Sequence, residues 1–295
     1  MRARMQGGGQ GRTGLLMVAP AGVLLILFFF VPVALGFALS FTDARLISPK
    51  PLEFVGLENF QRLLDDPVFW TSLRNTLFFA AVIVPAQSGF ALLLAVLVNV
   101  KMRGTNLFRM LYFVPVVTSI VVVSILWRFM YQPDGLVNSM LHWMTGNVVR
   151  VDWLNDTSTA LPAIMFMSAW QAVGFHMVIW LAGLQTIPGE LYEAAEIDGA
   201  GRWHQFRFIT WPGLRSTRTF ILVTITIAAL SLFTQIHVMT GGGPLDATST
   251  VVFQAVRVGY QQQQTAYASA ISLVFFLLVL AVSLIQRWLT RERSA

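Results

Sequence analysis

The chain has 295 residues, of which 56% are hydrophobic and 12% are charged, and its formal net charge is +6. Soluble domains carry roughly 25% charged residues, so this composition excludes an ordinary soluble domain and favours a protein that crosses a membrane several times. The positive net charge does not indicate nucleic-acid binding, because the sequence has no block of five or six basic residues. Cysteine is absent, which excludes a disulfide framework and thiolate chemistry.

Six apolar stretches are each long enough to cross a bilayer, which takes about 20 residues. Three arginines precede the first stretch, as in a signal peptide, but its apolar run is too long and ends at no clear cleavage site, so we expect a retained helix. We predict a tail over residues 1–14, a six-helix domain over 15–290 and a second tail over 291–295. The expected spans are 15–41, 75–100, 107–131, 160–185, 216–240 and 266–288.

Basic residues are distributed unevenly between the two sides that these spans would separate. Thirteen of the 20 Lys and Arg residues lie at the two termini, in the second-to-third connection and in the fourth-to-fifth connection. The positive-inside rule therefore predicts that both termini and these two connections are cytoplasmic. An even number of spans also requires both termini on one side, so the two observations agree.

The connection after the first span, residues 42–74, is long and acidic. Within it, the sequence Gly-Leu-Glu-Asn-Phe at 56–60 predicts a turn followed by a short interfacial helix, and a contact with a partner protein is an equally open interpretation.

Charged groups are missing from the places where several functions would need them. All 14 carboxylates lie outside the predicted spans, which disfavours ion-coupled transport. No Gly-x-x-x-x-Gly-Lys-[Ser/Thr] loop is present to cradle a phosphate, and the four histidines have no zinc-ligand spacing. We therefore expect no catalytic residue, no metal site and no cofactor in this chain.

A polar, charged loop over residues 188–212 separates the fourth and fifth spans. A Pro-Gly pair at 188–189 breaks the fourth helix, and the acidic residues that follow favour the start of a new short helix. Gly199 can adopt the left-handed conformation that ends a helix. Ala194 and Ala195 have small side chains, so a cleft in another protein could approach the helix closely there.

In this loop Glu-Ala-Ala at 193–195 is followed by Gly199, Ile209 and Pro212. With this spacing the loop resembles the EAA loop of permease subunits of ABC importers. The family pattern is Glu-Ala-Ala, three residues, Gly, nine residues, Ile, one residue and Leu-Pro. Trp211 replaces the usual Leu, which keeps the bulk and the apolarity. The matching residues are Glu193, Ala194, Ala195, Gly199, Ile209 and Pro212. The resemblance implies that the loop docks on a separate ATPase, whereas a solvated surface helix is the plainer interpretation. The implied coupling residues are Glu190, Tyr192, Glu193, Ala194, Ala195, Asp198, Gly199 and Pro212.

Further motifs resemble the carbohydrate-type permeases of this family in the same order along the chain. They are Gly56–Phe60, Leu111–Pro115, Trp170–Gln171, Leu181–Gln185 and Met239–Pro244. The resemblance implies an all-α integral membrane protein with six transmembrane helices, the type I ABC importer permease fold and a cytoplasmic coupling helix. It also implies a multi-pass protein of the bacterial or archaeal plasma (inner) membrane.

The function that this resemblance implies is ATP-driven, binding-protein-dependent import of a sugar, an oligosaccharide or a related polyol or glycerol phosphate. The implied partners are a second homologous permease, an ATPase dimer that binds ATP and Mg²⁺, an extracytoplasmic solute-binding protein and membrane lipid, with no nucleic acid. A stand-alone six-helix channel or facilitator for small solutes is the alternative.

Polar and aromatic groups at membrane depth are the candidates for a substrate path. Sugar hydroxyls need uncharged donors and acceptors together with aromatic faces. Ser231 and Gln235 are four residues apart and are expected to share a helix face. Hydrogen bonding between helices is an equally weighted interpretation for these polar groups and the favoured one for His176. No Lys or Arg lies deep in a span to hold an anionic group, which favours a neutral cargo. Arg128 lies near the outer end of the expected substrate path. The candidate path residues are Trp170, Gln171, Gly174, Ser231 and Gln235.

Overall fold

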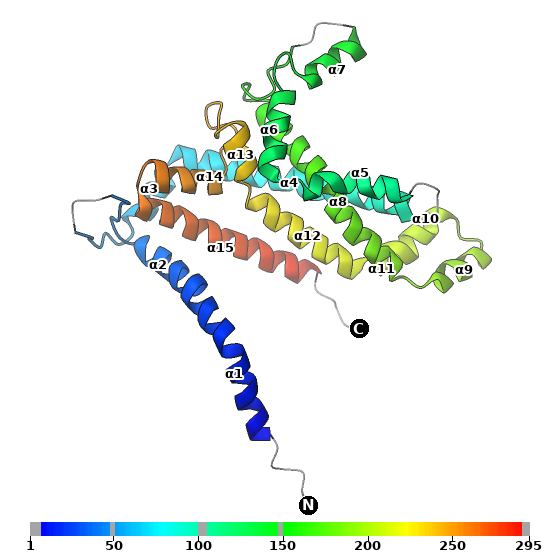
Figure 1. Cartoon of the computed structure of the whole chain (residues 1–295), viewed down its shortest axis with the longest axis horizontal. Helices are drawn as coiled ribbons and strands as arrows, with labels where there is room; N and C mark the ends of the chain where they lie inside the picture. Colours follow the sequence, from blue (N-terminus) through cyan, green and yellow to red (C-terminus); the bar gives the residue numbers. More distant parts are fainter. Residues whose placement is uncertain (1–6, 48–50, 100–104, 147–149, 291–295) are drawn as a thin grey trace, which may run out of the picture. The chain divides into compact units, whose positions relative to one another are not determined.

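The computed structural model describes residues 7–47, 51–99, 105–146 and 150–290, and the regular elements within these ranges are helices (Figure 1). The chain divides into two compact units, one of residues 1–66 and 255–274 and the other of residues 67–254 and 275–295. The helices are α1 (Gly7–Leu25), α2 (Val31–Leu39), α3 (Glu58–Asp65), α4 (Pro67–Asn99), α5 (Thr105–Val117), α6 (Ile120–Met130), α7 (Leu136–Thr145), α8 (Ala160–Gln185), α9 (Gly189–Ile197), α10 (Arg202–Gln205), α11 (Trp211–Gly213), α12 (Arg215–Leu230), α13 (Thr234–Met239), α14 (Val251–Val256) and α15 (Thr265–Thr290).

Five helical segments among the described residues are long and apolar enough to cross a membrane. They are Met17–Leu39, Pro67–Asn99, Ala160–Gln185, Arg215–Met239 and Thr265–Gln286. A sixth is obtained when Met110–Val117 and Ile120–Met130 are counted as one span. The expectation of an all-α membrane fold is therefore confirmed.

The predicted span over residues 107–131 is not a single straight helix. The chain bends by 105° between α5 and α6. Pro115 lacks an N–H group and so cannot support the last turn of α5. The hydroxyl of Thr118 donates to the Val114 carbonyl at 3.0 Å and satisfies one carbonyl at the break. Proline alone does not predict this bend, because α4 continues through Pro85.

In the first unit, the Gly56–Phe60 segment fastens the chain that leaves α2. Gly56 has a φ of +61°, a left-handed conformation that favours glycine, and α3 begins two residues later at Glu58. The Asn59 side-chain amide donates to the backbone carbonyls of Ser40 at 3.0 Å and of Thr42 at 2.8 Å. The predicted turn and short helix are confirmed, and the amide of Asn59 satisfies two backbone carbonyls of the chain that leaves α2.

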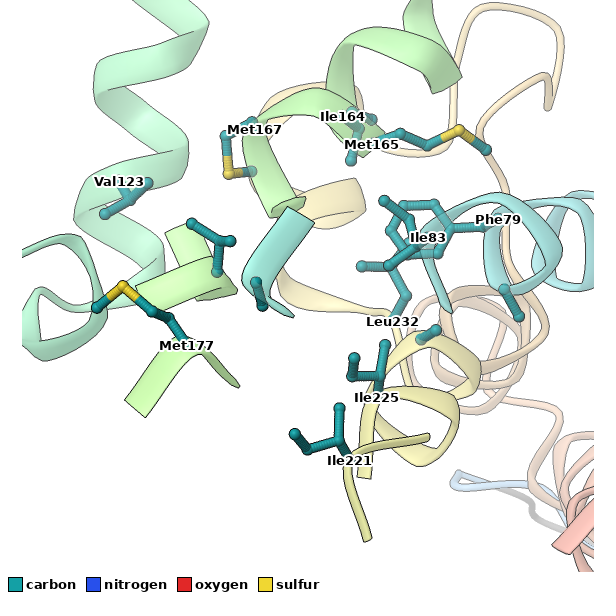
Figure 2. Close-up of a cluster of buried hydrophobic side chains, with 14 of the residues drawn as sticks. Phe79, Ile83, Val123, Ile164, Met165, Met167, Met177, Ile221, Ile225 and Leu232 are labelled. Atoms are coloured by element: carbon teal, nitrogen blue, oxygen red, sulfur yellow. The ribbon is translucent and has the colours of Figure 1, made fainter. Parts of the chain in front are cut away.

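The core of the second unit lies where α8 packs against α4 and α12. Figure 2 shows Phe79 and Ile83 of α4, Ile164 of α8 and Ile225 of α12 among the buried side chains of this core. The apolar stretch of α8 is 56% buried, compared with 39% for those of α4 and α12. The helix that leads into the 188–212 loop is therefore the central helix of its unit.

Buried polar groups tie α4 to α8 within this core. The amide nitrogen Nε2 of Gln87 lies 3.1 Å from Nδ1 of His176, and the Trp180 indole donates to the Ser88 carbonyl at 3.2 Å. Polar side chains commonly join helices in this way inside membranes, where water is not available as a partner. The favoured interpretation of His176, a hydrogen bond to a neighbouring helix, is confirmed.

Candidate functional site

The short helix α9 carries the acidic half of the 188–212 loop. It begins after Pro188, whose extended backbone (φ −58°, ψ 131°) interrupts the path of α8. None of the residues of α9 is buried, and the side chain of Ile197 is 88% exposed. Figure 1 shows α9 beyond the end of α8. Most of the surface of α9 is open in this chain, with only Tyr192 and Ala195 half-buried, so the helix has room to contact another protein along its length.

A defined backbone turn ends α9. Gly199 has a φ of +77°, as the sequence predicted. The Gly199 N–H donates to the Glu196 carbonyl at 3.0 Å, and the Ala200 N–H donates to the Ala195 carbonyl at 2.8 Å. These two bonds form a Schellman motif, which satisfies the last carbonyls of the helix and fixes the direction in which the chain leaves it.

The second half of the loop is a continuous helical stretch from Arg202 to Gly213, with a wide π-helical turn over Phe206–Thr210. Its buried Thr210 hydroxyl lies 2.9 Å from the Tyr192 hydroxyl of α9. This bond joins the two halves of the loop across 18 residues of sequence. We find no sequence pattern that predicts the role of Thr210, because the pairing depends on how the loop folds back.

An open, mostly apolar pocket of about 360 Å³ lies where the start of α9 faces the end of the loop. Leu191 of α9 lines it together with Ile209 and Pro212. Pro212, a predicted coupling residue, therefore lies near the start of α9 rather than at its exposed outer surface. Glu190, Glu193, Ala194 and Asp198 are exposed, and Ala195 is half-buried.

Two candidate path residues of α8 contact the break between α5 and α6. The Gln171 amide donates to the Pro115 carbonyl at 3.3 Å, which is one of the carbonyls that the end of α5 leaves without a helical partner. A side-chain carbon at Gly174 would collide with the Tyr112 carbonyl oxygen of α5. Both residues thus hold the bent segment against α8, and their contact with cargo stays a prediction.

Trp170 presents an aromatic surface beside these residues. Its ring is 43% exposed and lies edge-to-face with that of Trp127, 5.4 Å between centroids. An exposed ring fixed by a second ring is suited to stacking on a sugar, because little side-chain freedom is lost on binding.

The expectation that Ser231 and Gln235 share one helix face is wrong. Ser231 lies just after the last residue of α12, Leu230, and α13 begins only at Thr234. The intervening Phe233 has φ −136° and ψ −58°, which is not helical, so the four-residue spacing no longer places the two side chains on one stripe. Ser231 is exposed and Gln235 is half-buried.

The end of α6 lines a second, polar pocket of about 370 Å³. Arg128 reaches the Val238 carbonyl at 3.4 Å there, and Asn155, His237 and the Gly241–Pro244 loop complete the lining. Sequence reasoning noted Arg128 but not its grouping with residues about 110 positions away. Within the described part of the chain, no cluster of three His, Asp or Glu side chains is placed to hold a metal ion.

The apolar helices are those of a membrane-spanning protein, and comparison with known proteins gives its family. Residues 87–294 match the family described as binding-protein-dependent transport system inner membrane component, and the chain belongs to this family. It is therefore a multi-pass membrane protein and an ABC importer permease of the type I fold.

Individual relatives match along nearly their whole length. The lactose transport system permease protein LacF of Rhizobium radiobacter is 37% identical over 95% of both chains. The trehalose/maltose transport system permease protein MalF of Thermococcus litoralis is 34% identical over 94% of this chain and 92% of its own. A bacterial ABC transporter involved in the import of the acidic polysaccharide alginate has a chain that superposes with a TM-score of 0.84, at 25% identity, covering 97% of this chain and 98% of its own.

Proposed function

We propose that this chain forms half of the translocation path of an ATP-driven importer for a sugar, an oligosaccharide or a related polyol or glycerol phosphate. The other half is a second homologous permease, a solute-binding protein delivers the cargo, and a pair of ATPase subunits binds ATP and Mg²⁺. The relatives named for lactose and for trehalose and maltose support a saccharide cargo.

The observation that carries the coupling role is the construction of α9. The helix exposes Glu190, Glu193 and Ala194, yet it is fastened by the Schellman turn at Gly199 and by the Tyr192–Thr210 bond. Because α9 is accessible to a partner and fixed to the rest of the loop, a movement of the partner would shift the loop as a whole and would not deform α9 alone. We therefore propose that α9 inserts into a groove of the ATPase subunit and carries the motion of that subunit to α8.

Reconstitution tests the whole assignment. Proteoliposomes that contain this chain, its paired permease and the ATPase subunits are expected to take up saccharide only with the binding protein and internal ATP. Vesicles that contain this chain alone should take up none in response to ATP or a proton gradient, because the sequence has no phosphate-cradling loop and no carboxylate within its predicted spans. Robust uptake by this chain alone would overturn the assignment.

The cargo path is assigned to Trp170, Gln171, Gly174, Ser231 and Gln235, of which three can be tested by a change to Leu. Gln171→Leu, Ser231→Leu and Gln235→Leu are expected to reduce uptake while the assembled complex and its affinity for the binding protein stay intact. Normal uptake by all three variants would assign these side chains to helix contacts alone.

Orientation is tested at the end of α9. We propose cytoplasmic termini and a cytoplasmic 188–212 loop, from the distribution of Lys and Arg. Asp198→Cys provides a single thiol, since the sequence has no cysteine, and Asp198 is exposed. A membrane-impermeant thiol reagent should label it in inverted vesicles but not in intact cells. Labelling in intact cells would reverse the proposed topology.

A further inference from the structure

The basic and acidic residues of the 188–212 loop and the start of α12 are separated along the chain. Residues 202–218, here called the basic-aromatic segment, contain four arginines and four aromatic residues and no Asp or Glu. The acidic residues of the loop all lie earlier, from Glu190 to Asp198. The two halves therefore present opposite charges, and one partner surface does not complement both.

Successive ring contacts, here called the ladder, run along the basic-aromatic segment from Trp203 to Arg218. The rings of Trp203 and Phe206 stack with centroids 5.8 Å apart, and Phe206 lies 6.3 Å from Trp211. The guanidinium of Arg218 lies 4.6 Å from the centre of the Trp211 ring. Each ring holds the next, so the ladder brings an arginine of α12 onto an aromatic surface that begins at α10.

The segment remains accessible on the described chain. Trp203 is 68% exposed, Phe208 is 66% exposed, and the exposed guanidinium of Arg207 lies 5.9 Å from the Phe208 ring centre. Large aromatic side chains beside arginines, both exposed, are unusual for a surface that faces only water. They are typical of the boundary between a bilayer and water, where aromatic rings sit at the level of the lipid headgroups.

Chain connectivity places the segment at that boundary. The apolar span Arg215–Met239 overlaps its last four residues, so the arginines and rings lie where a helix leaves the membrane. This placement holds whichever side of the membrane the loop occupies.

We propose that the basic-aromatic segment is a binding site for anionic phospholipid, with Arg207 and Arg218 contacting the phosphate-containing headgroup. Trp203 and Trp211 lie against the upper acyl region, and the stack of Arg218 on Trp211 holds the guanidinium at headgroup depth. The choice of lipid over a second protein rests on the covalent link to the span and on the absence of any carboxylate in the segment. The proposal does not depend on the cargo or on the ATPase.

Lipid titration of the full chain in detergent micelles tests the site. Phosphatidylglycerol or phosphatidylcholine is added, and the lipids retained on each chain are counted by native mass spectrometry. Phosphatidylglycerol is expected to bind more tightly. An arginine close to an anionic headgroup contributes a factor of about five, so R207Q/R218Q should weaken phosphatidylglycerol binding roughly 25-fold and leave phosphatidylcholine binding unchanged. Trp211→Leu keeps every charge but removes the ring beneath Arg218, and it should weaken binding about threefold, within the range of one exposed cation–π contact.

The matched control is R45Q/R150Q, which removes two exposed arginines outside this segment and changes the net charge equally. Its phosphatidylglycerol affinity should stay within about twofold of that of the unmodified chain. An equal loss in this control, equal affinity for both lipids, or displacement of phosphatidylglycerol by the same concentration of inorganic phosphate would overturn the proposal. Unchanged lipid binding by R207Q/R218Q, with loss of ATPase association, would instead assign this surface to the ATPase.

Discussion

The two halves of the 188–212 loop are adjacent in sequence but opposite in construction. In α9 the exposed surface carries acidic side chains around the small Ala194, Leu191 and Ile197 are also exposed, and no residue is buried. From Arg202 onward the surface is basic and aromatic, and it continues directly into a membrane span. An acidic surface with a small residue at its centre suits a close contact with a basic surface of another protein, whereas bulky rings and arginines suit the membrane boundary.

The two halves of the loop are nevertheless joined to each other and to the neighbouring helices. The Tyr192–Thr210 bond and the turn at Gly199 hold α9 against the second half, and that half is continuous with α12. We therefore expect a displacement of α9 to move the end of α8 and the start of α12 together. On the assignments proposed above, the difference between the halves is that one surface receives motion and the other keeps a fixed depth in the membrane.

The largest expected effect comes from adding bulk to α9. Ala194→Trp should lower ATP-driven uptake at least tenfold and reduce co-purification of the ATPase, because a close-packed contact cannot accommodate a ring without strain. Ala194 is exposed in this chain, so the ring meets nothing within the subunit and the effect reports on a partner.

Phe208→Trp is the matched change in the basic-aromatic half, where the side chain is already large and 66% exposed. It should leave uptake within about twofold of normal. Equal loss of uptake in both variants, or normal transport by Ala194→Trp, would contradict the different roles proposed for the two halves.

A smaller effect is expected from the turn between the halves. Gly199→Val places a β-branched side chain at φ +77°, which costs about 1–3 kcal/mol in backbone strain, and it should lower uptake severalfold. In this variant, hydrogen exchange should accelerate at the backbone amides of positions 199 and 200. These two N–H groups make the two hydrogen bonds of the turn in the unmodified chain.

Gly201→Val is the control, because Gly201 has φ −67° and open space around it. The strain argument is wrong if the two valine variants exchange and transport alike.

The smallest effect concerns the hydroxyl bond that joins the halves. Tyr192→Phe removes the phenolic oxygen and should destabilise the loop by about 1 kcal/mol. A double-mutant cycle with Thr210→Val isolates the bond, with loop opening followed by hydrogen exchange. The double variant should lose less than the sum of the two single changes. Strictly additive losses would show that the bond, 2.9 Å long in the structure, does not couple the halves.

Much of the fold was predictable because its signals are local. Long apolar runs predict spans, and the Pro-Gly pair at 188–189 with Gly199 predicts a short helix between two breaks. The Gly56–Phe60 turn was predictable for the same reason, since glycine at φ +61° follows from local backbone sterics. The spacing of the EAA-like residues was sufficient to indicate the family before any contact was known.

The prediction of the candidate path was less successful. The spacing of Ser231 and Gln235 predicted a shared face, but the chain interrupts its helix between them. Likewise the Gln171–Pro115 bond depends on a bend of 105° that the sequence does not specify, since proline is tolerated in the unbroken α4. Local periodicity predicts positions within one helix, and it fails where packing decides that a helix must break.

The sequence by itself determined the membrane class, the order of the spans and the chemical character of each half of the loop, because composition, hydropathy and charge belong to the residues themselves. Only the tertiary structure decided which groups meet: Tyr192 with Thr210, Gln171 with Pro115, and Arg218 with Trp211. These pairs are 18, 56 and 7 residues apart. The first two depend on how the chain folds back or bends, and the third depends on helical turns that bring an arginine over a ring. The first two contacts are properties of the packed chain, and no single segment contains the information that sets them.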